Sequence, residues 1–113
     1  MNKPLSIKLA CLLALAGILL GGACYRQDIL TVEIHVPQMR ETECSRIIIR
    51  ALREVDGIQS VRPDTENRVL TVTYNARKLA LKNIEHTLAE QGFTANDEEA
   101  RSDARMRLPP ECR

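Results

Sequence analysis

The sequence predicts a small α+β domain with its elements in the order β-α-β-β-α-β. Two stretches alternate apolar and polar residues with the period of a half-buried strand, two longer stretches repeat apolar residues at helical spacing, and a glycine follows each helical stretch. This order is the split βαβ, ferredoxin-like arrangement, a four-stranded antiparallel sheet with two helices on one face. The 113 residues leave room for one such domain.

The first strand and first helix are predicted from periodicity and from the residues that end them. Residues 28–36 (DILTVEIHV) are expected to form a strand that ends at Pro37, because proline cannot donate to a sheet ladder. A helix is expected from about Glu43 to Val55, with Thr42 as its N-cap and Gly57 just beyond its end. The strand residues expected to face the core are Leu30, Val32, Ile34 and Val36.

The second half repeats this pattern with one additional strand. Residues 58–65 form the expected second strand, whose outer part is assigned to a sheet edge because it contains Pro63. Residues 69–74 (VLTVTY) alternate again, and residues 79–91 form the second amphipathic helix. Residues 93–95 are left for a brief fourth strand.

Changes in composition divide the chain into four parts. Residues 1–23 read as a signal peptide and residues 24–29 as a linker. Residues 30–95 form the predicted domain, and the charged residues 96–113 are expected to be a flexible tail.

The N-terminal segment has the composition of an export signal. Lys3 and Lys8 precede an apolar run over residues 9–20, and small residues follow at positions 21–23. The run is shorter than the roughly 20 apolar residues of a membrane-spanning helix, and an uncleaved anchor is kept as an alternative. The protein is therefore expected to be exported to a bacterial periplasm.

Cys24 follows the small residues directly. The segment Leu20-Gly21-Gly22-Ala23-Cys24 resembles the box in which bacterial lipoproteins acylate a cysteine, although Gly21 stands where an aliphatic residue belongs. Ordinary cleavage after Ala23 is the alternative. Contact with a membrane is expected only through this lipid or an uncleaved anchor.

Composition excludes several functions. Loss of residues 1–23 removes two lysines and no acids, which leaves a formal charge near −1 and no basic patch for nucleic acid. The chain has no Cys-x-x-Cys, no Ser-His-Asp set and no glycine-rich phosphate loop. A non-enzymatic protein is expected, in which His35 and His86 are ordinary surface residues.

A set of apolar and glycine positions over about residues 31–95 resembles the heavy-metal-associated domain family. This is the family of copper chaperones, of the N-terminal modules of metal-pumping ATPases and of the periplasmic mercury-binding protein. The resemblance implies a ferredoxin-like fold that binds or transfers Cu(I), Hg(II) or Zn(II), with a metal-transporting membrane protein or a second copy of the chain as partner. The residues that carry it are Ile34, Val36, Met39, Cys44, Ile48, Ala51, Leu52, Val55, Gly57, Ile58, Val61, Leu70, Val72, Tyr74, Ile84, Leu88, Gly92 and Phe93.

The metal loop departs from the family pattern Gly-Met-x-Cys-x-x-Cys. Cys44 holds the second cysteine position, Glu41 stands in place of the first, and Gln38 replaces the glycine. The resemblance implies that Met39 packs under the loop and that Phe93 shields Cys44. Because soft ions prefer sulfur to carboxylate, Cys44 and Glu41 alone make an incomplete site.

Three completions of this site are open: Cys44 of a second protomer, Cys112 from the tail, or thiols of a partner protein. A thiol in the first turn of a helix is a good ligand because the helix dipole favours its thiolate. The alternative is a Cys44–Cys112 disulfide in a metal-free structural or interaction module, since leftover cysteines usually pair in an oxidising compartment. The metal-carrier hypothesis depends on a Cys44 sulfur that is exposed, and a sulfur sealed in the interior, far from any opening, would remove the case for a metal carrier.

Overall fold

The computed structural model describes residues 28–113. The predicted signal peptide over residues 1–23 and the candidate lipidation site Cys24 lie outside the described residues, and both stay predictions. Within the described part of the chain, no helix is long and apolar enough to cross a membrane.

The first five elements follow the predicted order, and two more follow them. They are β1 (Ile29–His35), α2 (Thr42–Arg53), β2 (Ile58–Asp64), β3 (Val69–Asn75), α3 (Leu81–Glu90), α4 (Ser102–Arg107) and the 3₁₀ turn η2 (Pro110–Cys112). The start of α2 differs from the prediction, because Glu41 and not Thr42 is its N-cap and no side chain caps the helix.

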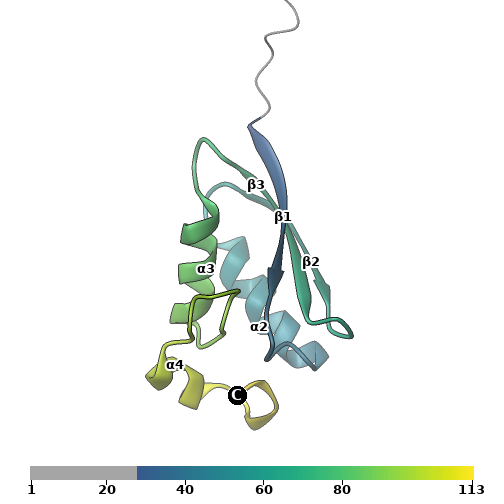
Figure 1. The fold of residues 1–113 in the computed structure, drawn as a ribbon, viewed down its shortest axis with the longest axis vertical. Coiled ribbons are helices and arrows are strands. Elements are labelled where there is room, and N and C mark those ends of the chain that lie inside the picture. Colours follow the sequence, from purple (N-terminus) through teal and green to yellow (C-terminus); the bar gives the residue numbers. More distant parts are fainter. Residues whose placement is uncertain (1–27) are drawn as a thin grey trace, which may run out of the picture.

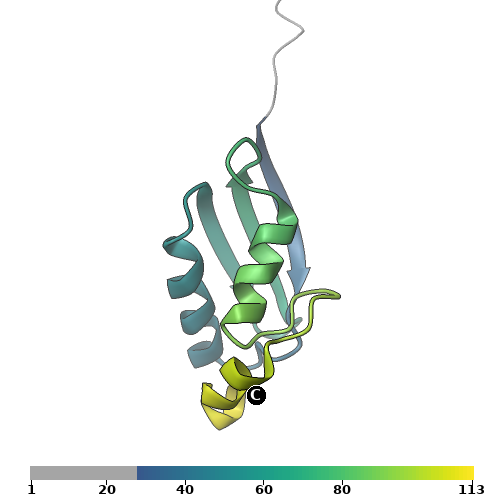
Figure 2. The same ribbon diagram turned by 90° about the vertical axis from the view of Figure 1, so that its left-hand side faces the viewer.

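The sheet is antiparallel with the strand order β1-β3-β2. Helices α2 and α3 pack on one face, and no element among residues 28–113 covers the opposite face (Figures 1 and 2). The largest fully buried side chains are Phe93, Ile34, Met39, Ile48, Leu52, Leu70, Ile84, Leu88, Val36 and Val72. Leu30 was expected in this core but is 43% exposed, because it lies near the free end of β1.

The prediction of a fourth strand is wrong, because residues 28–113 form a three-stranded sheet. After Phe93 the chain reaches the edge of β1 at one residue only. Asn96 N donates to His35 O at 2.9 Å, and Asn96 Oδ1 accepts from His35 N at 2.9 Å. Asn96 has a φ of +51°, and an isolated bridge joins Ala95 to Glu98, so the chain turns away from β1.

The segment 96–113, expected to be a flexible tail, is folded and packed against the domain. It contains α4 and η2, and it buries Ala104, Leu108 and Cys112. These three residues are spaced by four positions, an apolar pattern that the surrounding charges obscure in the sequence. The segment packs tightly against Gly92. A side chain there would clash with it, because an added Cβ would lie 2.7 Å from Arg105 N.

Candidate functional site

The site predicted around Cys44 is closed by a disulfide. Cys44 lies in the first turn of α2 and is bonded to Cys112 in η2, with the two Cα atoms 5.5 Å apart. Both cysteines are fully buried. The expectation of an exposed Cys44 sulfur is therefore wrong for this state, while the Cys44–Cys112 pairing, one of two alternatives from the sequence, is present.

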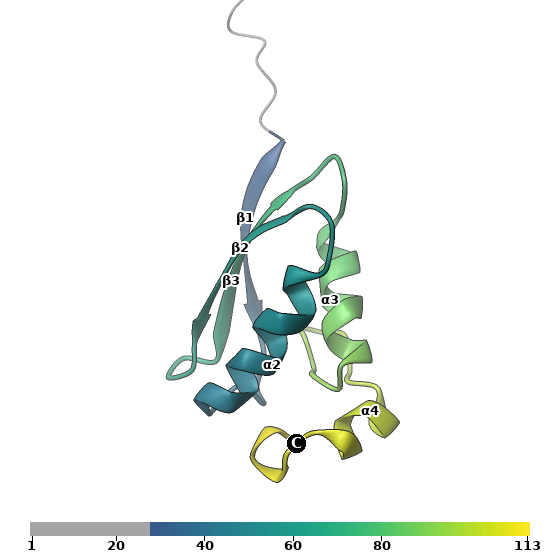
Figure 3. The same cartoon turned by 180° about the vertical axis from the view of Figure 1, so that it is seen from behind.

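Several elements meet at the end of the domain that contains the disulfide. The start of α2, the end of β1 and the C-terminal segment gather there, as the view from behind shows (Figure 3). The first turn of α2 is held by Cys44 N, which donates to Glu41 O at 3.1 Å, and by Ser45 Oγ, which donates to Thr42 O at 2.7 Å. These two contacts lie within residues 41–45 and do not involve the C-terminal segment.

Gln38 joins the loop to the C-terminal segment, a role that the sequence did not reveal. Its Nε2 donates to Gly92 O at 2.8 Å and to Cys112 O at 3.0 Å, and its Oε1 accepts from Thr94 N at 2.6 Å. The side chain is buried, and all of its hydrogen-bonding partners are backbone groups. Glycine, which the family pattern has at this position, could make none of these side-chain contacts.

Met39 and Phe93 are both fully buried in the same apolar cluster as Cys44 and Cys112. This position is compatible with the supporting roles that the resemblance implied.

Glu41 is exposed at the N-cap of α2. Among residues 28–113, no group of three or more His, Cys, Asp or Glu side chains is arranged to hold a metal ion. His86 is exposed on α3, where it lies 3.2 Å from Glu90 and 3.6 Å from Glu98. In the disulfide form, Glu41 therefore belongs to no such group among the described residues.

Charged groups on α4 stabilise the C-terminal segment only modestly. Arg101 Nε lies 2.8 Å from Asp103 Oδ1, and Arg107 approaches the same carboxylate at 3.5 Å. Desolvation raises the pKa of Asp103, but the charges of these arginines and hydrogen bonds from Arg101 and Ala104 hold the pKa below its usual value. Exposed pairs of this kind contribute little to stability, so the segment depends chiefly on the disulfide, on apolar burial and on the buried hydrogen bonds of Gln38.

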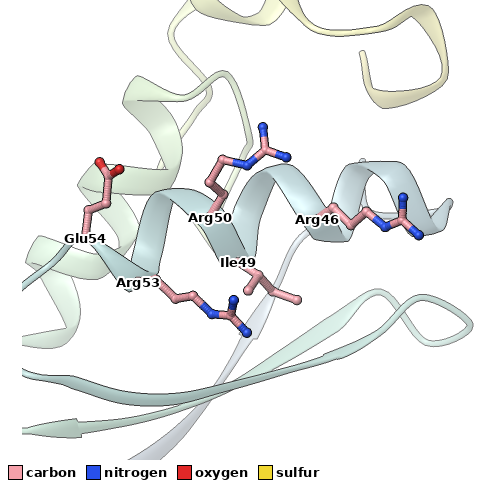
Figure 4. A pocket seen from close by; sticks show the side chains of 5 residues that line it. All are labelled: Arg46, Ile49, Arg50, Arg53 and Glu54. Carbon is pink, nitrogen blue, oxygen red and sulfur yellow. The ribbon is translucent and has the colours of Figure 1, made fainter.

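A surface hollow on α2 is a poor candidate for a ligand site. It is lined by Arg46, Ile49, Arg50, Arg53 and Glu54. The guanidinium groups of Arg46, Arg50 and Arg53 point in different directions (Figure 4). They do not converge on one anion, and none of the lining residues offers sulfur or imidazole to a soft metal.

Comparison with known proteins identifies the family. The heavy-metal-associated domain matches residues 33–94. Because the match spans more than half of the 113 residues, the chain belongs to this family. No curated protein matches the chain.

Solved structures share the ferredoxin-like fold. Oxidised MerP from Ralstonia metallidurans CH34 is 25% identical and has a TM-score of 0.57, with 60% of this chain and 94% of MerP covered. A mutant of ZiaAN is 28% identical with a TM-score of 0.55, covering 61% of this chain and 97% of its own. CopZ, a metallochaperone, is 24% identical with a TM-score of 0.56, covering 58% and 98%. None of these comparisons indicates an enzymatic family.

Gln38→Ala is expected to lower the free energy of unfolding by about 2–4 kcal/mol, because it leaves two carbonyl groups and one N–H without partners near the core. Urea unfolding of the oxidised protein measures this change. Gln59→Ala is the control, since Gln59 is exposed on β2 and its replacement should have an effect within about 0.5 kcal/mol. Equal effects of the two substitutions would contradict the role given to Gln38.

Proposed function

We propose that the protein binds a soft metal ion through Cys44 and Cys112 after the bond between them is reduced. The observation that carries this proposal is the meeting of two sulfur atoms at the end of the domain where the family places its cysteine pair. Cys44 keeps the family's second position. Cys112 supplies from the C-terminal segment the sulfur that is lacking at Glu41.

The donor set suits a soft cation. An external dithiol supplies two electrons and two protons to the disulfide and is itself oxidised, and the metal then displaces protons from the two thiols. Thiolates prefer Cu(I), Hg(II) and Zn(II) to hard ions. With metal–sulfur bonds of about 2.3 Å, the two sulfurs need to move apart by roughly 1.7 Å for a tetrahedral ion and about 2.5 Å for a linear one.

Local structure supports such an adjustment. Cys44 is fixed in α2 near the positive end of the helix dipole, which favours its thiolate. Cys112 lies in a single 3₁₀ turn, so a small shift of η2 opens the space. Exposed Glu41 lies in the loop beside Cys44 and is proposed as a weaker third ligand.

Family membership supports a metal ion as the cargo. The likeness to MerP in an oxidised form supports a change of oxidation state at the site. We further propose export to the periplasm, with Cys24 as a lipid anchor. A metal-transporting membrane protein is the proposed partner for transfer.

The second candidate function is a metal-free interaction module with a permanent disulfide. The complete burial of both sulfurs favours it, together with the hydrogen bonds of Gln38, which complete the closed state. In this function, reduction would loosen the C-terminal segment without creating a metal site.

Competition with a Cu(I) chelator under anaerobic conditions separates the two functions. The metal-binding function predicts that reduced protein withdraws one Cu(I) per chain and that oxidised protein withdraws none. Failure of the reduced protein to bind more Cu(I) than the oxidised protein would favour the interaction module.

A further inference from the structure

The outer edge of β1 has backbone groups that are not paired by any other part of residues 28–113. Ala76 N donates to Asp28 O at 2.6 Å and Val36 N donates to Arg68 O at 2.9 Å, so residues 28 and 36 face the ladder with β3. Because hydrogen bonding alternates along an antiparallel strand, Ile29, Thr31, Glu33 and His35 direct their N–H and C=O groups away from β3.

Within the part of the chain that the structure describes, one of these four residues is paired at the outer edge. Asn96 forms hydrogen bonds with both the N–H and the C=O group of His35. The Nδ2 of Asn96 donates to Glu85 Oε2 at 3.0 Å, which holds the Asn96 side chain in place. The outward groups of Ile29, Thr31 and Glu33 find no partner among residues 28–113. The side chains of these three residues are exposed as well.

The other edge of the sheet is protected in the usual way. Strand β2 contains Arg62, Pro63 and Asp64 and has an irregular register between Ile58 and Ser60. Proline, charges and irregularities are the devices that prevent edge-to-edge pairing. Strand β1 (ILTVEIH) contains no proline and one acidic residue.

Exposed apolar side chains gather on the unprotected strand. The large hydrophobic residues exposed in the described chain are Ile29 and Leu30, each 43% exposed, and Met106 on α4. Leu30 alternates in step with Val32 and the buried Ile34, which places it on the face that the helices cover. Such a segment favours association with another strand.

We propose that β1 pairs antiparallel with β1 of a second copy of this chain, forming a continuous six-stranded sheet. A two-fold axis at Thr31 pairs the outward N–H and C=O groups of Thr31 with those of Thr31 in the second copy. It also pairs the outward groups of Ile29 in each copy with those of Glu33 in the other. The same register packs Leu30 against Val32 of the second copy. No like charges face each other, and threonines pair favourably across strands.

Self-complementarity is the reason to assign a second copy and not an unrelated strand. The register satisfies all of the open groups of Ile29, Thr31 and Glu33 and needs none of the groups of His35, which Asn96 binds. It requires the second copy to leave the shared sheet before its residue 27, which would otherwise lie opposite His35. It does not use the disulfide end of the domain. This inference is therefore independent of metal binding.

Thr31→Pro tests the pairing because the Thr31 N–H is not used in the ladder with β3. Proline is tolerated where its nitrogen faces outward on an edge strand, but it blocks pairing there. Thr31→Val is the matched control: both substitutions remove the hydroxyl contact with Thr73, but valine keeps the N–H. Sedimentation velocity of full-length oxidised protein with alkylated free thiols is expected to show non-covalent dimers for the wild type and for Thr31→Val. For Thr31→Pro, we expect self-association weaker on the order of 100-fold.

A monomeric wild type at millimolar concentration, or a Thr31→Pro variant that associates like the wild type, would overturn the proposal. If Thr31→Pro does not fold, hydrogen exchange of the wild type decides. Protection of the Thr31 and Glu33 N–H groups that rises with protein concentration supports the dimer. Absent protection overturns it, as does protection independent of concentration, which would indicate that the N-terminal segment of the same chain covers the edge.

Discussion

Cys112→Ser is expected to lower the free energy of unfolding of the oxidised protein by about 4 kcal/mol, given a sequence separation of 68 between the bonded cysteines. The main physical reason is that the disulfide restricts the unfolded chain, and a long closed loop gives a large restriction. The loss is comparable to the whole stability of a marginal small domain. Guanidinium unfolding of the oxidised protein and the variant measures it.

Reduced wild-type protein is the control for this substitution. It lacks the same covalent bond but keeps both sulfur atoms, so its stability is expected to match that of Cys112→Ser. A variant that unfolds at the same denaturant concentration as the oxidised wild type would show that the disulfide does not form or does not contribute.

Cys44→Ala and Cys112→Ala are each expected to abolish Cu(I) binding by the reduced protein, because either change leaves a single sulfur at the site. Glu41→Ala is the matched loop variant. It should change the affinity by no more than about tenfold, since a carboxylate adds little to a soft ion. Chelator competition on the reduced proteins gives both the affinity and the stoichiometry.

The stoichiometry of Cu(I) binding by Cys112→Ala distinguishes two ligand sets, namely Cys44 from two protomers and the pair Cys44 and Cys112 from one chain. Retained binding at one metal per two chains would show that Cys44 residues of two protomers share the ion. That result would contradict the intramolecular pair of Cys44 and Cys112.

Local patterns in the sequence predict the fold up to α3. The alternation in residues 29–35 and 69–75 and the helical spacing of Ile48, Leu52, Ile84 and Leu88 depend on neighbouring residues, which the sequence displays directly. The missing fourth strand depends instead on Asn96. A non-glycine residue with φ of +51° and side-chain bonds to His35 and Glu85 turns the chain away, and no short-range rule predicts this.

The C-terminal segment escaped prediction for a similar reason. In the sequence, Ala104, Leu108 and Cys112 stand among charged residues. They are buried because the segment packs against the end of the domain near Cys44, and this surface cannot be recognised from the local sequence. For the site, the sequence placed Cys44 and offered its pairing with Cys112 as one alternative. The role of Gln38 could not be found, because its three partners are backbone groups at positions 92, 94 and 112.

Non-reducing peptide mapping of protein from its native compartment tests the central claim most directly. After alkylation of free thiols, trypsin should release residues 41–46 (ETECSR) joined to residues 108–113 (LPPECR), and a reductant should separate them. Recovery of both peptides alkylated, or of residues 41–46 joined to the peptide that contains Cys24, would contradict the account.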